Sequence, residues 1–147
     1  MPRILVTGSR DWDNRVTISR VVLGYINKVC PMLLDENGHP DRRDTSDVVI
    51  VHGACPDGAD ALVEEWAQGC VPPIKTEPHP ADWVAAPKIG GLLRNKYMVD
   101  LGADICLAFL KPCVSDRCQR EEVHYSHGAA HCLTLAHRAG IEVQITD

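Results

Sequence analysis

The sequence lacks the features that mark membrane proteins, secreted proteins and proteins that bind duplex DNA. No apolar run approaches the ~20 residues that a membrane span needs. The start, Met-Pro-Arg, leads at once into a strand-like run and does not have the shape of a signal peptide. Acidic residues outnumber basic ones, and the formal net charge is −5. Duplex nucleic acid requires a basic face, so the charge argues against it as a partner.

Internal repeats and low-complexity segments are also absent, and the seven cysteines do not make an even set. A chain of 147 residues is one domain that can bury a full core without disulfide staples. Its composition, 45% hydrophobic and 24% charged, is that of an ordinary globular protein. We therefore expect a cytoplasmic protein with reduced thiols, some of them on a metal ion.

The stretch 47–67 organises the rest of the chain. An apolar, β-branched run at 48–51 predicts a strand that is buried on both faces. The run breaks at Gly53 and Gly58, and apolar residues then recur at helical spacing up to residue 67. A strand, a glycine turn and a helix together aim backbone N–H groups at an anion. A tight turn capped by aspartates explains the same residues, and for one turn alone it is at least as good an interpretation.

Two common phosphate-binding motifs are missing from this turn. Gly53 and Gly58 have the spacing of a P-loop, but Ala59-Asp60 stands where a P-loop has Lys followed by Ser or Thr. A P-loop that hydrolyses Mg–ATP is therefore excluded. The chain also contains no Gly-x-Gly-x-x-Gly fingerprint.

Strands and helices alternate along the chain. The expected strands are 3–8, 48–51, 74–79, 103–110 and 141–145, and the expected helices are 14–30, 59–67, 92–101 and 128–139. This order predicts an α/β fold: one three-layer domain over 1–147, with a mostly parallel sheet of about five strands covered on both faces. Residues 31–47 are polar and rich in turn formers, and we expect a surface loop there. Ligands of such sheets bind at the carboxyl ends of the strands, where the glycine turns meet.

Four side chains near these turns have both a binding and a structural interpretation. Arg10 follows the first strand and could pair with a phosphate, although a solvated loop arginine looks the same. Asp60 could accept ribose hydroxyls or cap the helix. Trp83 could stack on a base or anchor its loop. Asn95 could bond a ligand or satisfy a turn.

Five ordered motifs run through most of the chain. They are Val6-Thr-Gly-Ser-Arg, His52-Gly-Ala-x3-Gly-Ala-Asp60, Ala81-Asp-Trp83, Arg94-Asn-x2-Met98 and Ala139-Gly-Ile-x-Val143. With these motifs the sequence resembles the YspA/YpsA-related group of the SLOG superfamily, which also includes DprA and the LOG enzymes. The resemblance leaves out 31–47 and an insert at 112–125. It implies a Rossmann-like fold that binds a nucleotide or a nucleotide-derived small molecule.

The resemblance and the strand-end positions together give a set of expected ligand-binding residues. They are Gly8, Ser9, Arg10, Gly53, Ala54, Gly58, Asp60, Asp82, Trp83, Arg94, Asn95, Ser126 and Gly128. LOG-type members split an N-glycosidic bond with an arginine and with a glutamate that follows a Pro-Gly-Gly-x-Gly-Thr loop. Here the corresponding stretch begins Ser126-His-Gly-Ala-Ala and has neither that loop nor its glutamate.

Three functions follow as expectations. The first is a sensor or sequestering module that binds the nucleotide-derived ligand. The alternative is an N-glycosidic or phosphoribosyl hydrolase of a nucleoside monophosphate or ADP-ribose-like ligand, in which Arg94 orients phosphate and Asp60 or Asp82 acts on the ribose or on water. The second alternative is a DprA-like binder of single-stranded DNA, which the acidic balance disfavours. Whether the chain is an enzyme, and whether it forms a homo-oligomer, stays open.

A second candidate site lies in the insert and the helix after it. Two cysteines and three histidines between 113 and 131, followed by Cys132, offer six nitrogen or sulfur ligands. Four such ligands form a closed structural zinc site, and we expect Cys113, Cys118, His124 and Cys132 to do so. The choice between His124, His127 and His131 rests on their positions in the chain. The alternative to a zinc site is that the cysteines of the insert are unrelated and that Cys132 belongs to the core. Cys55, in the ligand turn, could be reactive.

Overall fold

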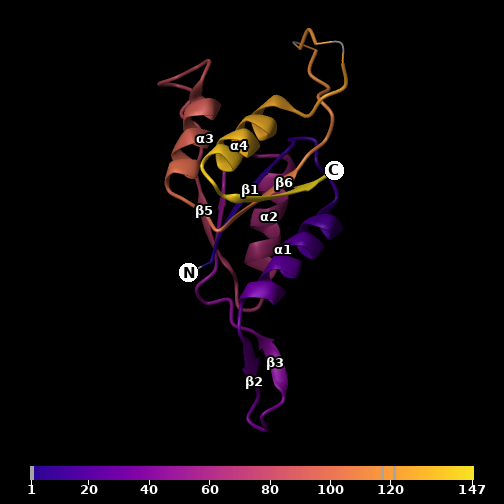
Figure 1. The fold of residues 1–147 in the computed structure, drawn as a ribbon, viewed down its shortest axis with the longest axis vertical. Coiled ribbons are helices and arrows are strands. Elements are labelled where there is room, and N and C mark those ends of the chain that lie inside the picture. Colours follow the sequence, from indigo (N-terminus) through magenta and orange to yellow (C-terminus); the bar gives the residue numbers. More distant parts are fainter. Residues whose placement is uncertain (1, 117, 121) are drawn as a thin grey trace.

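The computed structural model describes residues 2–116, 118–120 and 122–147. The elements are β1 (Arg3–Gly8), α1 (Arg15–Val29), β2 (Met32–Leu34), β3 (Pro40–Arg43), β4 (Val49–His52), α2 (Gly58–Gly69), β5 (Lys75–Pro78), α3 (Gly90–Asp100), β6 (Ile105–Phe109), α4 (His127–Arg138) and β7 (Glu142–Thr146). Figure 1 shows their arrangement. None of the helices in the described residues is both long and apolar enough to cross a membrane.

The main sheet has five strands in the order β5-β4-β1-β6-β7, and every neighbouring pair is parallel. The α/β fold with a parallel sheet of about five strands, predicted from the sequence, is therefore confirmed. After β5 the chain crosses back over the sheet to place β6 on the other side of β1. The direction of winding reverses between β1 and β6, and in doubly wound sheets such a reversal marks the ligand crevice.

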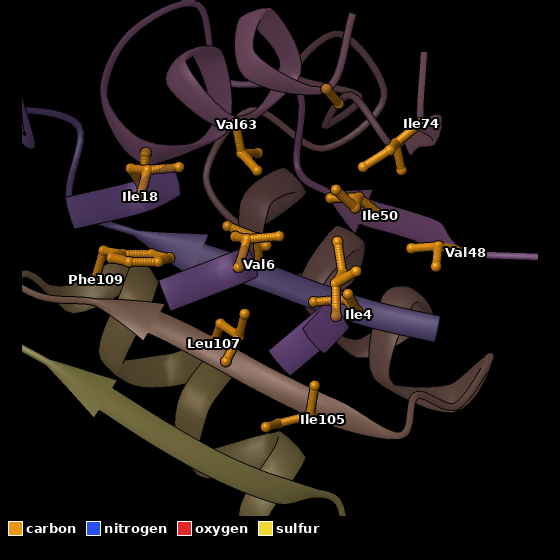
Figure 2. Close-up of a cluster of buried hydrophobic side chains, with 14 of the residues drawn as sticks. Ile4, Val6, Ile18, Val48, Ile50, Val63, Ile74, Ile105, Leu107 and Phe109 are labelled. Carbon is orange, nitrogen blue, oxygen red and sulfur yellow. The ribbon is translucent and has the colours of Figure 1, made fainter. Parts of the chain in front are cut away.

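One face of the sheet is covered by α1 and α2. Because side chains alternate along a strand, Ile4, Val6 and Ile50 point to this face with Leu107 and Phe109 from β6. Figure 2 shows these side chains meeting those of the two helices and of the segment before β5. The helix residues at the centre of this layer are Ile18, Val22, Ile26, Ala59, Val63 and Ala67.

The other face is covered by α3 and α4. Leu5 and Cys106 are fully buried there against Met98 of α3 and Cys132 of α4. A sheet with helices on both faces has no solvated side, which explains why the central strands are continuous apolar runs. Pro78 lies at the end of β5, an edge strand, where its missing N–H leaves no gap in the ladder.

The segment 31–47, expected as a surface loop, is exposed but is partly regular. β2 and β3 pair in an antiparallel hairpin. Its turn is held by Asp35, whose carboxylate accepts hydrogen bonds from the backbone N–H groups of Asn37 and His39, each at 2.9 Å. Gly38 adopts the positive φ of 81° that the turn requires. Figure 1 shows the hairpin projecting from the opposite end of the molecule to the loop after β6.

Close packing of backbone joins the loop after β1 to the start of α2. Gly58 has a φ of 76°, and a Cβ on it would overlap the carbonyl oxygen of Ser9 and the Cα of Arg10. The N–H of Ala59 donates to that same Ser9 carbonyl at 3.3 Å. Only glycine allows this approach, so Gly58 fixes where the segment after β1 lies relative to α2.

Gly58→Ala tests this packing. The substitution combines a left-handed backbone conformation with a backbone overlap, so the free energy of unfolding should fall by about 2–4 kcal/mol. Gly24→Ala is the matched control, because Gly24 lies in α1 with open space around it and should gain up to about 1 kcal/mol. Urea unfolding followed by circular dichroism measures both. Equal stability of the two variants would show that the contact with Ser9 carries no constraint.

Candidate functional site

A cavity of about 500 Å³ opens at the carboxyl edge of the sheet, beside the reversal between β1 and β6. Its walls come from the segments after β1, β4 and β6, from α3 and from the first turn of α4. The described residues that line it are Val6, Thr7, Gly8, Arg10, Asp11, Gly53, Cys55, Asp60, Trp83, Lys88, Gly91, Leu92, Arg94, Asn95, Met98, Pro112, Cys113, Val114, Ser115, Ser126, His127, Gly128 and Ala129.

Most of the expected ligand-binding residues line this one cavity. Those in the wall are Gly8, Arg10, Gly53, Asp60, Trp83, Arg94, Asn95, Ser126 and Gly128. Ser9, Ala54, Gly58 and Asp82 are not in the wall. Ser9 is buried behind it, and Asp82 is exposed and accepts a hydrogen bond from the N–H of Ala85 within its own loop.

Arg94 is held against the turn that follows β4. Its Nη1 donates to the carbonyl oxygens of Gly53 and, at 3.3 Å, of His79. Its Nε donates to Oδ1 of Asn95 at 2.9 Å. A Cβ at Gly53 would collide with the guanidinium, so glycine is needed for Arg94 to reach this position. The result is a cation fixed at the cavity wall by three neutral oxygens.

Asn95 in turn connects α3 with α4. It is buried, and its Nδ2 donates to the carbonyl oxygen of Gly128 at 3.1 Å and to Nδ1 of His131 at 3.2 Å. Burial lowers the pKa of His131, so its ring is neutral near pH 7 and can accept this bond. Asn95 therefore has a structural role, because its side chain bonds α4, and it also positions Arg94.

The turn after β4 is supported from inside by two buried side chains. His52 accepts the N–H of Ala54 on Nδ1 at 3.0 Å, so its Nε2 donates to Glu64 at 2.8 Å. Asp60, in the first turn of α2, accepts the N–H of Cys55 at 3.3 Å. Burial and the Asp60 carboxylate raise the pKa of the Cys55 thiol, which keeps it protonated and disfavours the reactive role.

A compact hydrogen-bond set joins the segments after β1 and β6. The Ser9 and Ser126 hydroxyl oxygens lie 2.7 Å apart, and the N–H of Lys111 donates to Ser9 Oγ at 2.8 Å. The N–H of Ser126 donates to the carbonyl of Lys111 at 3.1 Å. Ser126 precedes α4 but makes no side-chain cap, because its hydroxyl is directed to Ser9. The first N–H groups of α4 at the cavity are thus left without a side-chain cap.

The charged side chains in the described wall are three cations and two carboxylates. They are Arg10, Lys88, Arg94, Asp11 and Asp60. In a chain with a formal net charge of −5, this is a local excess of positive charge. Apolar surface in the same wall comes from Leu92, Met98 and Val114, and from the half-exposed Trp83. The cavity therefore offers both charged and apolar surface, which suits an anion attached to a flat ring.

Next to the cavity, four metal-binding side chains converge, and we name them the Cys2His2 cluster: Cys113, Cys118, His124 and His127. Their ligand atoms all lie within 4.8 Å of one another. Cys118 Sγ is 3.4 Å from His124 Nε2 and 3.5 Å from His127 Nε2, and the two Nε2 atoms are 2.9 Å apart. A tetrahedral zinc ion, with bonds of about 2.3 Å to sulfur and 2.0–2.1 Å to nitrogen, separates such atoms by about 3.3–3.8 Å.

The outer contacts of the cluster also suit a metal ion. Nδ1 of His124 lies 2.8 Å from the carbonyl oxygen of Glu122, and a carbonyl can only accept a proton. Nδ1 must therefore carry the proton, which leaves the Nε2 lone pair directed into the cluster. The donor set of two sulfurs and two imidazole nitrogens fits a tetrahedral site. The Cys2His2 cluster can hold a metal.

The structure differs from the sequence-based prediction at one ligand, Cys132. This residue is fully buried between α4 and the sheet, next to Cys106, and it is not part of the Cys2His2 cluster. Burial raises the pKa of Cys132 to about 11, whereas a metal ligand must be a thiolate. Among the described residues, the fourth side chain of the cluster is that of His127. The signal was present in the sequence, since Ala129, Cys132 and Ala136 recur at the spacing of a buried helix face.

Several residues of the cavity wall were not among the ligand-binding residues expected from the sequence. Lys88 lies in the loop between β5 and α3, where no pattern marks one lysine above another. Leu92 and Met98 look like ordinary helix residues until α3 is placed beside the cavity. Thr7 belongs to β1 and reaches the wall only because this strand ends at the sheet edge.

Asn95→Leu tests the link between Arg94 and α4. The change keeps the side-chain size but leaves the Gly128 carbonyl and the Arg94 Nε without their partner, so we expect a loss of about 2–3 kcal/mol in stability. Lys96→Ala, at the neighbouring exposed position that pairs with Asp100, should change stability by less than about 0.5 kcal/mol. Thermal and urea unfolding measure both. A loss no larger in Asn95→Leu than in Lys96→Ala would contradict the assigned role.

Comparison with known proteins identifies the family of the chain. No solved structure matches the chain. The Gene 61 protein of Mycobacterium phage D29 is 36% identical over 146 residues, which cover 97% of this chain and 94% of that protein. Residues 2–85, which run from β1 into the loop after β5 and carry much of the cavity wall, match the YspA, cpYpsA-related SLOG family. The chain belongs to this family.

Proposed function

We propose that the protein binds a nucleotide or a nucleotide-derived small molecule in the cavity, as a sensor or a sequestering module. Family membership supports a nucleotide-related role. The observation that carries the proposal is the position of the cavity, at the reversal between β1 and β6, with the fixed cation Arg94 in its wall. Its volume of about 500 Å³ falls in the range of about 300–1,000 Å³ that is common for small-molecule sites.

A phosphate group is the part of the ligand that the cationic side chains of the wall would bind. Arg10 is exposed at the rim, and Arg94 is fixed in the wall. The uncapped first turn of α4, at Ser126 and Gly128, adds backbone N–H groups and the positive end of a helix dipole. The base would then lie against Trp83, which stays in place because the glycines at the start of α3 leave room for its ring.

Hydrolysis of the same ligand is the competing function, and Asp60 is the observation that favours it. Asp60 lines the cavity close to the turn that Arg94 contacts, whereas Asp82 is not in the wall. A hydrolase would therefore use Asp60. Its carboxylate already accepts the N–H of Cys55, which favours a role in shaping the turn and leaves binding as the leading function.

Arg10→Ala and Arg94→Ala test the binding site. Loss of one charge-assisted hydrogen bond should weaken binding by about 1.5–3 kcal/mol, or roughly 10–150-fold. Isothermal titration with AMP, ADP-ribose and NAD measures the affinity, and chromatography of the same mixtures detects free base. Arg138→Ala is the control, since this arginine is exposed at the far end of α4. Unchanged affinity in both wall variants would remove the two arginines from the site, and release of base would identify a hydrolase.

We further propose that the metal of the Cys2His2 cluster is zinc and that its role is structural. Four protein ligands of this type complete a tetrahedral zinc site and leave no position for a catalytic water. Zinc thiolates persist in a reducing compartment, which is consistent with seven cysteines that form no disulfide and with a protein of the cytoplasm.

Elemental analysis of protein purified without chelator or affinity metal tests the zinc site. We expect about one zinc per chain, because the four ligand atoms all lie within 4.8 Å of one another and are of the kinds that zinc binds. Cys113→Ser and Cys118→Ser should lose the metal, while Cys132→Ser should keep it. Zinc that disappears in Cys132→Ser would restore the sequence-based ligand set. Metal-free wild-type protein in which the cluster thiols titrate freely would refute the site.

A further inference from the structure

We propose that metal occupancy of the Cys2His2 cluster controls the affinity of the cavity for its ligand. The metal would act by holding the loop after β6 in a fixed position relative to the first residue of α4. The ligand half of this proposal rests on the proposed nucleotide site, and the metal half rests on the proposed zinc site at the Cys2His2 cluster.

The cluster and the cavity share two residues. Cys113 and His127 supply ligand atoms to the cluster and also line the cavity. Cys118 and His124 belong to the cluster, but they are not among the described residues in the cavity wall. One layer of side chains therefore forms the boundary between the two sites. A metal ion on the far side of that layer determines where Cys113 and His127 can lie.

The loop is anchored at its end by Tyr125, which packs against the buried Leu110 and Ala129 and whose hydroxyl donates to Asp147 at 2.7 Å. The described part of it pairs with itself through the Cys113 N–H and the His124 carbonyl, at 2.7 Å, and through a bridge between Pro112 and Tyr125. Further into the loop the apolar side chains are exposed: Val114 is 76% exposed and Val123 is 87% exposed. A short two-stranded ribbon with so little apolar burial is marginal in water. Metal binding would then supply the local folding free energy, as it does in small zinc domains.

The loop is connected directly to the centre of the cavity wall. Lys111 at its beginning and Ser126 at its end both contact the hydroxyl of Ser9, which is 1% exposed. Ser9 lies between Gly8 and Arg10, both of which line the cavity. His127 follows Ser126 directly and begins α4. When the metal fixes His127, it also fixes Ser126 and the uncapped N–H groups that we assign to phosphate.

Linkage makes this coupling reciprocal. If zinc raises the affinity of the cavity for a nucleotide by some factor, the nucleotide raises the affinity for zinc by the same factor. The protein would then release its ligand when zinc is removed or when the two cluster thiols are blocked. Coupling between two sites of one protein commonly amounts to about 5–150-fold.

Hydrogen–deuterium exchange on the full chain tests the metal half without any nucleotide. Zinc is removed from wild-type protein by a chelator under reducing conditions and is then added back. Exchange at the amides of Cys113 and Ser126 should accelerate at least about tenfold without zinc, because local opening controls it, and should recover with zinc. The amide of Ile50, in the central sheet, is the internal control. Equal exchange rates at Cys113 and Ser126 in zinc-free and zinc-loaded protein, or a protein that binds no zinc, would overturn the proposal.

The ligand half is tested with AMP on two variants that alter the cluster without altering the cavity wall. His124→Ala and Cys118→Ser should lose zinc and should bind AMP about tenfold or more weakly, as zinc-free wild-type protein does. Cys70→Ser is the control, because Cys70 ends α2 and contacts neither site. AMP affinity that survives the loss of zinc would overturn the coupling. If zinc-loaded wild-type protein binds no AMP, the proposed ligand fails for this probe, and the exchange measurement still decides whether zinc orders the loop.

Discussion

The structure depends on the double-sided burial of its three central strands. Every residue of β4 and β6 is buried, as is most of β1, so side chains that alternate along each strand fill a core on both faces. The register is fixed as a result, since a slip of one residue would exchange the two cores. The pairing of Leu5 with both Val51 and Cys106 brings the ends of these strands to one edge. The cavity forms at this edge, where the segments that follow the buried strands turn away from the sheet.

Much of the fold could be predicted from the sequence because the strands carry strong local signals. β1 was expected at 3–8 and is found as Arg3–Gly8. The prediction failed where tertiary contacts outweigh local preference. α3 begins at Gly90, earlier than its apolar spacing indicated, because the two glycines that leave room for the ring of Trp83 have no side chain to extend that spacing. The β2–β3 hairpin was not predicted because its strands are short and exposed, and no hydrophobic alternation marks them.

The candidate site could be predicted as a set of segments but not as a set of side-chain directions. Parallel strand ends identify which turns meet, and this placed Gly8 and Gly53 at one cavity. Arg94, in α3, was expected there from the family resemblance. Sequence spacing does not tell which way an aspartate or a cysteine points. Asp82 closes its own loop, and Cys132 faces the core of the domain. Three residues of the Cys2His2 cluster were expected from the sequence, but the fourth, His127, joins them through the path of the loop, which no short-range pattern encodes.

The hairpin of β2 and β3 has a practical consequence. It projects from the end of the molecule opposite the loop that carries the cluster (Figure 1), and its turn at Asn37 and Gly38 is exposed. Exposed turns of this kind tolerate inserted residues. A fluorophore, a surface tether or a fusion partner attached there would leave both the cavity and the Cys2His2 cluster accessible. This turn is therefore a suitable attachment site for immobilised or single-molecule measurements.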